Sequence, residues 1–161
     1  MTELKKTIVN AIQSGLRPQG FEKDGSVWFR QRDGIVSMLG LEQSPHGFQN
    51  FWLEIGLYVR ALAEQYDSLS KKGVPRPSIG GWHLIGQLDQ YNAELKTALT
   101  GDAAVSDEFR RSAIQSALQN RALPLFASFE TRDGIRKHFP QGGGFTSTAR
   151  LRKFIESSDV T

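Results

Sequence analysis

The stretch FWLEIGLYVR, residues 51–60, decides the fold class, because large apolar side chains occupy every second position along it. This period of two is typical of a β-strand with one face in a core. The expected core face consists of Phe51, Leu53, Ile55, Leu57 and Val59. The expected opposite face consists of Trp52, Glu54, Gly56, Tyr58 and Arg60.

Alternating patterns also predict strands over residues 26–31 and 35–43, so the three strands should form an antiparallel meander with short connections. A fourth, short edge strand is expected within residues 82–88. For the first hairpin we predict a three-residue loop, Arg32-Asp33-Gly34, with Gly34 left-handed. That register would put Val27 and Phe29 in the core and Trp28 and Arg30 on the opposite face.

Helices are predicted before and after this meander. Residues 2–14 have apolar side chains at helical spacing, with Thr2 as N-cap and Gly15 as the left-handed stop. Short helices are expected over residues 61–69 and 91–99. A longer helix should begin after Ser106 and be broken or restarted at Pro124. Thr131 should cap a helix to about residue 139, and Ser147 should cap a terminal helix.

These elements predict a two-layer α+β fold, with an antiparallel meander of three to four strands packed against the N-terminal and C-terminal helices. The 161 residues suit a single domain, with a flexible glycine-rich joint at residues 140–146 before the last helix. The N-terminal helix and the long helix after Ser106 should cover the face that contains Leu53 and Ile55.

Several short motifs resemble one known family. Gly20-Phe21 enters the first strand, which contains Trp28-Phe29-Arg30, and the second strand ends in Leu41-Glu42-Gln43-Ser44. Farther along stand Leu123-Pro124-Leu125-Phe126 and Thr131-Arg132-Asp133-Gly134. Together with residues 51–59, these segments resemble the bacterial domain of unknown function family 4304 over about residues 1–135. The resemblance implies the order of helix, meander and helices, and it implies no chemistry.

Composition excludes several classes of protein. Cysteine is absent, which excludes disulfides, thiolate metal sites and a cysteine nucleophile, and suits a reducing cytoplasm. No apolar run reaches the length of a membrane span, and the N-terminal residues do not form a signal peptide, so we expect no membrane association. The net charge of +3 comes from residues 121–161, where 7 basic side chains outnumber 4 acidic ones.

No catalytic or metal-binding motif is recognisable. His46, His83 and His138 lack the spacing of metal ligands, so we expect structural or surface histidines, no metal and no cofactor. Phosphate loops and nucleophile elbows are absent from the sequence. Glu42 and Glu54 could face each other across neighbouring strands as an acid–base pair, which leaves a hydrolase as an alternative.

The most suggestive feature is the predicted non-core face of the sheet. Aromatic and arginine side chains would alternate there, and they can stack on bases or hold an acidic peptide. The tentative binding residues are Trp28, Arg30, Trp52, Tyr58 and Arg60, joined by Gln43 and Ser44 in the loop before residue 51. Alternatively, the C-terminal helices cover this face and the aromatic residues form a second core layer, while Gln43 and Ser44 belong to an ordinary turn.

The leading hypothesis is therefore a non-catalytic cytoplasmic module that binds another protein or a peptide through this face. A nucleic-acid-binding module is the alternative, suggested by the positive charge and the arginine residues. Because residues 1–120 contain 13 basic and 13 acidic side chains, a continuous basic stripe is not expected there, and protein binding ranks first.

Overall fold

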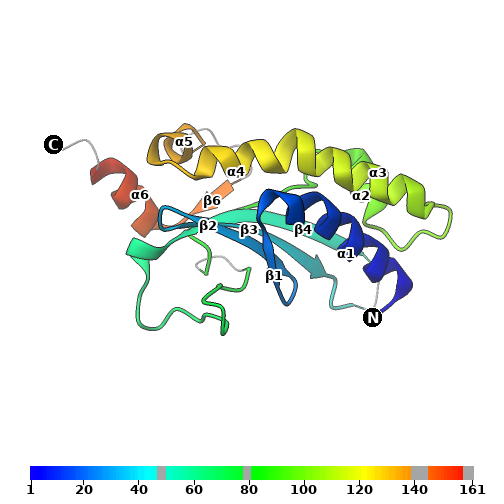
Figure 1. Ribbon diagram of the computed structural model, residues 1–161, viewed down its shortest axis with the longest axis horizontal. Helices are drawn as coiled ribbons and strands as arrows, with labels where there is room; N and C mark the ends of the chain where they lie inside the picture. Colours follow the sequence, from blue (N-terminus) through cyan, green and yellow to red (C-terminus); the bar gives the residue numbers. More distant parts are fainter. Residues whose placement is uncertain (47–49, 78–80, 139–144, 158–161) are drawn as a thin grey trace.

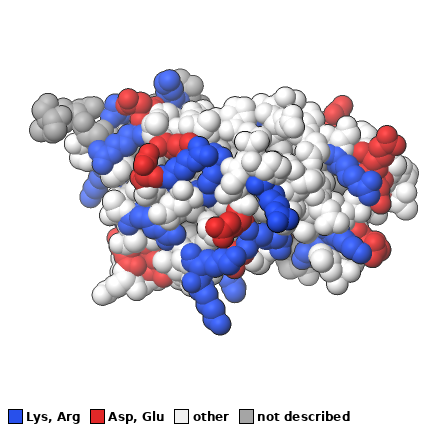
Figure 2. Space-filling view, in the orientation of Figure 1, with Lys and Arg blue, Asp and Glu red and all other residues white. Residues whose placement is uncertain are grey.

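The computed structural model describes residues 1–46, 50–77, 81–138 and 145–157. A twisted antiparallel sheet forms the middle layer, helices lie on one of its faces, and an irregular segment crosses the other (Figure 1). We call residues 63–77 the strap, the helix-covered side the helix face, and the other side the strap face. Basic and acidic side chains are interspersed over the surface seen in the same view (Figure 2).

The helices begin where polar side chains cap them. α1 (Glu3–Leu16) begins at Thr2, whose hydroxyl accepts the Lys5 amide at 3.2 Å. α3 (Asp107–Ala117), capped by Ser106, continues through a π-helical turn (Leu118–Ala122) into α4 (Leu123–Phe129). The wider turn precedes Pro124, which has no amide hydrogen to donate, so the helix restarts there as predicted. The shorter helices are α2 (Ala93–Ala98), α5 (Arg132–Lys137) and α6 (Ala149–Glu156).

The described strands pair in chain order, each antiparallel to the next. They are β1 (Glu22–Asp24), β2 (Val27–Arg32), β3 (Ile35–Gln43), β4 (Phe51–Val59), β5 (Leu84–Gln87) and β6 (Phe145–Ser147). The α+β class and the central meander are confirmed, but the sheet has six strands rather than three to four. β1 and β6 were missed because a three-residue strand is too short to show a period of two.

The predicted register of the first hairpin is wrong. Arg32 pairs with Ile35 and Trp28 pairs with Leu39, so the loop is the two-residue Asp33-Gly34 turn. Both turn residues have positive φ, 49° and 76°, as a type I′ turn requires. A shift of one residue moves every β2 side chain to the other face. The three-residue loop was preferred because only one face was assumed to be apolar, whereas both faces of this sheet are buried.

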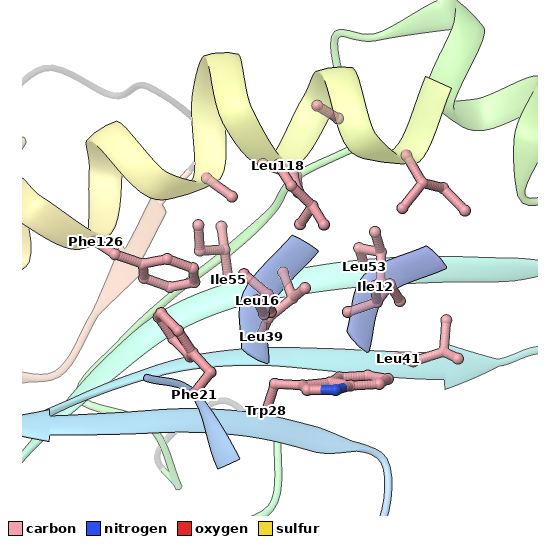
Figure 3. Packing of buried hydrophobic residues seen from close by; sticks show 14 of the residues in the cluster. Ile12, Leu16, Phe21, Trp28, Leu39, Leu41, Leu53, Ile55, Leu118 and Phe126 are labelled. Carbon is pink, nitrogen blue, oxygen red and sulfur yellow. The ribbon is translucent and has the colours of Figure 1, made fainter. Parts of the chain in front are cut away.

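The helix face forms the larger core, as predicted. Leu53 and Ile55 of β4 lie beneath Ile12 and Leu16 of α1 and beneath Leu118 and Phe126 of the α3–α4 helix (Figure 3). All six of these side chains are almost completely buried. Because apolar burial is the main stabilising term in folding, this layer dominates the stability of the protein.

The strap face forms a second core, which the strap covers instead of the C-terminal helices. Val74 of the strap and Trp82 are buried against sheet residues. That cluster draws on four strands, β2 to β5, and comprises Val27, Val36, Met38, Tyr58, Val74, Trp82 and Ile85. Glycines make room for it, since a Cβ on Gly40 would lie 2.6 Å from Pro77 Cγ and one on Gly56 would lie 2.6 Å from Trp82. A second core layer therefore exists, but the strap covers it instead of the C-terminal helices, and of Trp28, Trp52 and Tyr58 only Tyr58 belongs to it.

Three further local predictions need correction. Gly15 lies inside α1 and does not end it, and the left-handed residue is Gly20, at φ 81°. A Cβ on Gly15 would lie 2.8 Å from Leu118, so the glycine allows close helix packing. Residues 61–69 contain a single 3₁₀ turn (Arg60–Leu62) instead of a helix. Thr148 caps α6, because Ser147 still belongs to β6. In the predicted joint, residues 140–144 lie outside the described residues, whereas 145 and 146 belong to β6.

Candidate functional site

The predicted aromatic and arginine surface does not form as one patch. Trp28 lies on the helix face and is almost fully buried in its core, with the Lys23 ammonium 5.5 Å from the ring centroid. Arg30 also lies on the helix side. It stacks on Phe21 at 4.7 Å, donates to the Gln19 carbonyl at 2.7 Å and pairs with Glu130 at the end of α4. Both residues therefore contribute to structure and are not available as a joint binding surface with β4.

Tyr58 and Arg60 are on the strap side, but the strap contacts both. The Tyr58 hydroxyl donates to Asp67 Oδ2 at 2.6 Å, and Arg60 Nη1 donates to the Gly73 carbonyl at 2.5 Å. The Arg60 guanidinium also lies 5.6 Å from the centre of the Tyr58 ring. Burial and the hydrogen bond to Asp67 raise the pKa of Tyr58 to about 12, so it stays a neutral donor. This pair anchors the strap to the sheet.

His83 completes a buried polar cluster under the strap. Its ring stacks on Tyr58 at 4.4 Å, and its Nδ1 accepts the Val59 amide at 2.8 Å, which assigns the proton to Nε2. Nε2 has no hydrogen-bond partner among the described residues. Burial, assisted by the charge of Arg150, lowers the pKa of His83 to about 4. Its ring is thus buried and hydrogen-bonded to the backbone of β4.

The C-terminal helix closes the same cluster from the side. Arg150 of α6 lies 3.2 Å from Glu64, 3.7 Å from Asp67 and donates to the Leu62 carbonyl at 2.9 Å. Burial alone would raise the pKa of Asp67. Hydrogen bonds from Tyr58 and the Glu64 amide, with the charge of Arg150, bring it below its ordinary value instead. Sequence reasoning missed Asp67 and Arg150, because no local pattern links residues that are 83 positions apart.

The other two histidines, His138 and His46, have ordinary surroundings for a folded protein. His138 lies 3.0 Å from the Ser128 hydroxyl and packs edge-on against Phe129, and burial, followed by the charge of Lys137, lowers its pKa. His46 is exposed. Within the described part of the chain, no three His, Asp or Glu side chains are grouped as metal ligands would be. In the same part, no helix is both long and apolar enough to cross a bilayer.

What remains of the predicted surface lies at one end of the strap face. Glu42, Trp52 and Glu54, which we call the open end, are only half-buried, whereas Gly40 and Gly56 farther along the sheet are buried. Glu42 pairs directly with Trp52 across β3 and β4, and Glu54 is the diagonal neighbour of Glu42. The Trp52 indole N–H donates to Glu54 Oε1 at 3.1 Å.

Gln43 and Ser44 continue from this end into the β3–β4 loop. Gln43 is exposed, and the Ser44 amide bonds the Asn50 carbonyl at 3.0 Å, as in an ordinary turn. The structure therefore leaves Trp52 on the strap face, apart from Trp28, Arg30, Tyr58 and Arg60. Gln43 pairs with Phe51, so it belongs to the opposite face, and Ser44 follows in the loop.

A cavity of about 400 Å³ adjoins the open end. Glu42 forms part of its wall, together with Asp24 of β1 and Ser70 and Arg76 of the strap. The Ser70 hydroxyl bonds to Asp24, which ties the strap to the edge strand. The complete lining is Asp24, Gly25, Ser26, Val27, Glu42, Ser70, Val74, Pro75, Arg76 and Pro77. The sequence predicted that Pro75-Arg76-Pro77 in this wall is extended, but it did not predict that the segment lies over the sheet.

Glu42 is the electrostatically unusual group at this end. Burial raises its pKa, repulsion by Glu54 raises it further, and the charge of Lys5 offsets part of the increase. The two carboxylates that sequence analysis paired are thus close enough to interact, on the face predicted for them. They differ in surroundings, since Glu54 holds the Trp52 indole and Glu42 borders the cavity.

Fold and site together define an α+β protein whose open antiparallel sheet has helices on one face and an irregular strap beside a polar cavity on the other. The chain belongs to the family described as Domain of unknown function (DUF4304), whose model matches residues 12–128. The match confirms the resemblance seen in the sequence. No curated protein and no solved structure matches the chain.

Proposed function

We propose that this protein is a non-catalytic module that binds another protein or a peptide through the open end and the adjoining cavity. The observation that supports this is the change in burial along the strap face. The described strap packs closely over Gly40, whereas Trp52, Glu42 and Glu54 beyond it remain half-exposed. A half-buried tryptophan next to a carboxylate that lines a cavity is the kind of anchor that dominates protein interfaces.

The surroundings of Trp52 favour a rigid docking surface. Its side chain stands on a central strand between two carboxylates, and its indole N–H is held by Glu54 at 3.1 Å. A side chain that is already ordered loses little conformational entropy when a partner binds. The absence of cysteine favours a cytoplasmic location for this module.

Panning of a random displayed peptide library on the immobilised protein tests the proposal. We expect selected peptides whose binding is lost in Trp52→Ala and kept in Tyr91→Ala, a control at an aromatic residue that is 68% exposed elsewhere. Trp52→Phe, which keeps an aromatic ring, should retain part of the binding. Thermal melts must show that each variant is folded. Peptides that bind Trp52→Ala as well as the parent would refute the proposal.

A hydrolase is the second candidate, favoured by the raised pKa of Glu42 beside a cavity. A carboxyl group with a raised pKa can act as a general acid near neutral pH. A screen of ester, glycoside and phosphoester substrates with the parent, Glu42→Gln and Glu54→Gln tests this alternative. Turnover that disappears in Glu42→Gln would establish it, and turnover that is equal in all three proteins would argue against it.

The nucleic-acid alternative has less support at this site. Two carboxylates flank Trp52, and they would repel a phosphate backbone. The arginine residues that suggested it, Arg30 and Arg60, contact Glu130 and Gly73. Salt-sensitive retention of single-stranded DNA that is lost in Trp52→Ala would restore this alternative.

A further inference from the structure

The chemistry of the open end narrows the class of partner, provided that the proposed binding function holds. Trp52 occupies the position between Glu42, its direct cross-strand partner, and Glu54, whose carboxylate accepts its indole N–H. This half-buried part of the sheet thus combines one aromatic ring with a carboxylate on the neighbouring strand and a second carboxylate two residues along the same strand. An aromatic ring and a carboxylate are the two groups that attract a protein-bound cation most effectively.

Next to Trp52, the carboxylates of Glu42 and Glu54 are opposed by one cation, Lys5, among the groups that shift the pKa of Glu42. The cavity wall is more balanced, because Asp24 and Glu42 lie there with Arg76 and the Lys23 ammonium donates to the Gly25 carbonyl. Glu54 adds a further carboxylate next to Glu42, and Lys5 of α1 offsets only part of their repulsion. Because Glu42 is partly buried, its carboxylate interacts more strongly with a nearby charge than a fully solvated group would.

Charge complementarity therefore favours some kinds of partner segment over others at the open end. An acidic or phosphorylated segment would meet Glu42 and Glu54 directly, and like charges in contact disfavour association. A purely apolar segment would remove these carboxylates from water without providing a partner for them. A cationic side chain compensates the carboxylates and can stack on Trp52 at the same time.

We propose that the open end binds a lysine or arginine side chain, so that the partner of this protein is a segment that presents a basic residue. Glu42 and Glu54 receive the cation, Trp52 provides the aromatic surface beneath it, and the cavity beside Glu42 has room for flanking residues of the partner.

The experiment uses the peptides that depend on Trp52 in the panning described above. We expect lysine or arginine to be enriched at one position among them. A synthetic peptide of this set is compared with copies in which that residue is citrulline, the neutral counterpart of arginine, or norleucine, the neutral counterpart of lysine. Calorimetry should show binding that is at least about tenfold weaker for the neutral copies, since a cation–π contact with a paired charge contributes this much.

Glu42→Gln and Glu54→Gln should each weaken binding of the basic peptide several-fold and leave binding of the neutral copies unchanged. Glu108→Gln, at an exposed carboxylate on α3, is the matched control and should bind like the parent. Equal affinity for basic and neutral peptides, or enrichment of acidic peptides, would overturn the partner class while the proposed function stands. Failure to select any peptide that depends on Trp52 would instead remove the proposed function itself.

Discussion

The two faces of the sheet are both buried, but they are closed in different ways. On the helix face, α1 and the continuous α3–α4 helix press apolar side chains onto β3 and β4. On the strap face, a segment almost without regular structure lies over the sheet and is held by individual polar contacts. Those contacts include Tyr58 to Asp67 at 2.6 Å, Arg60 to Gly73 at 2.5 Å and the Trp82 indole to the Pro75 carbonyl at 3.0 Å.

This difference explains why ionisable side chains contribute to the packing of the strap face. A helix satisfies its own backbone and needs only an apolar stripe to pack. The backbone of an irregular segment needs side chains as hydrogen-bond partners. Asp67, Arg60 and Arg150 bond backbone groups in or near the strap and therefore lie in or next to the core. The helix face therefore determines most of the stability, and the strap face determines how stability depends on pH. The candidate site lies where the described strap no longer buries the strap face.

The largest expected loss of stability comes from disrupting the core on the helix face. Leu53→Asp would insert an unpaired carboxylate at a side chain that is 0% exposed, at the centre of the larger core. We expect a loss of at least about 4 kcal/mol in the free energy of unfolding, enough to unfold the domain. Leu69→Asp in the strap, at a side chain that is 41% exposed, should cost far less. Urea denaturation followed by circular dichroism measures both, and equal losses would contradict the comparison.

The next largest expected effect concerns His83 on the strap face and the pH dependence of the unfolding free energy. The pKa of His83 falls from 6.5 to about 4 on folding, so the unfolded chain binds the extra proton between these values. Stability from this group is complete above pH 6.5 and is lost as the pH falls towards 4, by up to about 3 kcal/mol. Groups that face His83 include Tyr58, Asp67 and Arg150.

His83→Gln removes this titration, whatever it does to stability at neutral pH. We therefore expect the unfolding free energy of the variant to fall less steeply between pH 6.5 and 4 than that of the parent. Chemical denaturation at several pH values gives the two slopes. Parallel slopes would mean that the imidazole titrates alike in the folded and unfolded states.

The smallest expected effect concerns the open end. The folded state raises the pKa of Glu42 above 4.5, so folding opposes its ionised form at neutral pH. For such a group, relative stability is present below the unfolded pKa and is lost as the pH rises through the folded one. Glu42→Gln should therefore raise the unfolding free energy at pH 7 slightly, by less than about 1 kcal/mol, and lose this advantage near pH 4.

Thermal melts of parent and Glu42→Gln at the two pH values check this sign. The control is Glu108→Gln, since Glu108 is exposed on α3 and away from Glu54. A variant that is less stable than the parent at pH 7 would show that the Glu42 carboxylate stabilises the fold. If Glu42→Gln is more stable, as expected, and also binds the partner less tightly, the Glu42 carboxylate costs a little stability and contributes to binding.

Elements with a long, regular pattern could be predicted from the sequence. β4 was recognised from five apolar side chains at alternate positions, and the caps Thr2, Ser106 and Thr131 were each found at the start of their helices. β1 and β6 could not be recognised, because each has three residues and owes its existence to pairing with a neighbour. The sequence placed Glu42 and Glu54 on the same face of neighbouring strands but left the register open, and the structure makes them diagonal neighbours instead of a directly facing pair.

The sequence by itself determined the class of fold, the helix face of β4 and the family, because these depend on periodicity and on short motifs within single elements. Only the tertiary structure decided which face each β2 side chain occupies. With apolar residues on both sides of the sheet, either register buries hydrophobic groups, and the covering of both faces by the helices and the strap accommodates the register that the Asp33-Gly34 turn closes. Only the tertiary structure brought Tyr58, Asp67 and Arg150 together and left Trp52 half-exposed, because long-range packing of an irregular strap has no periodic signature in the chain.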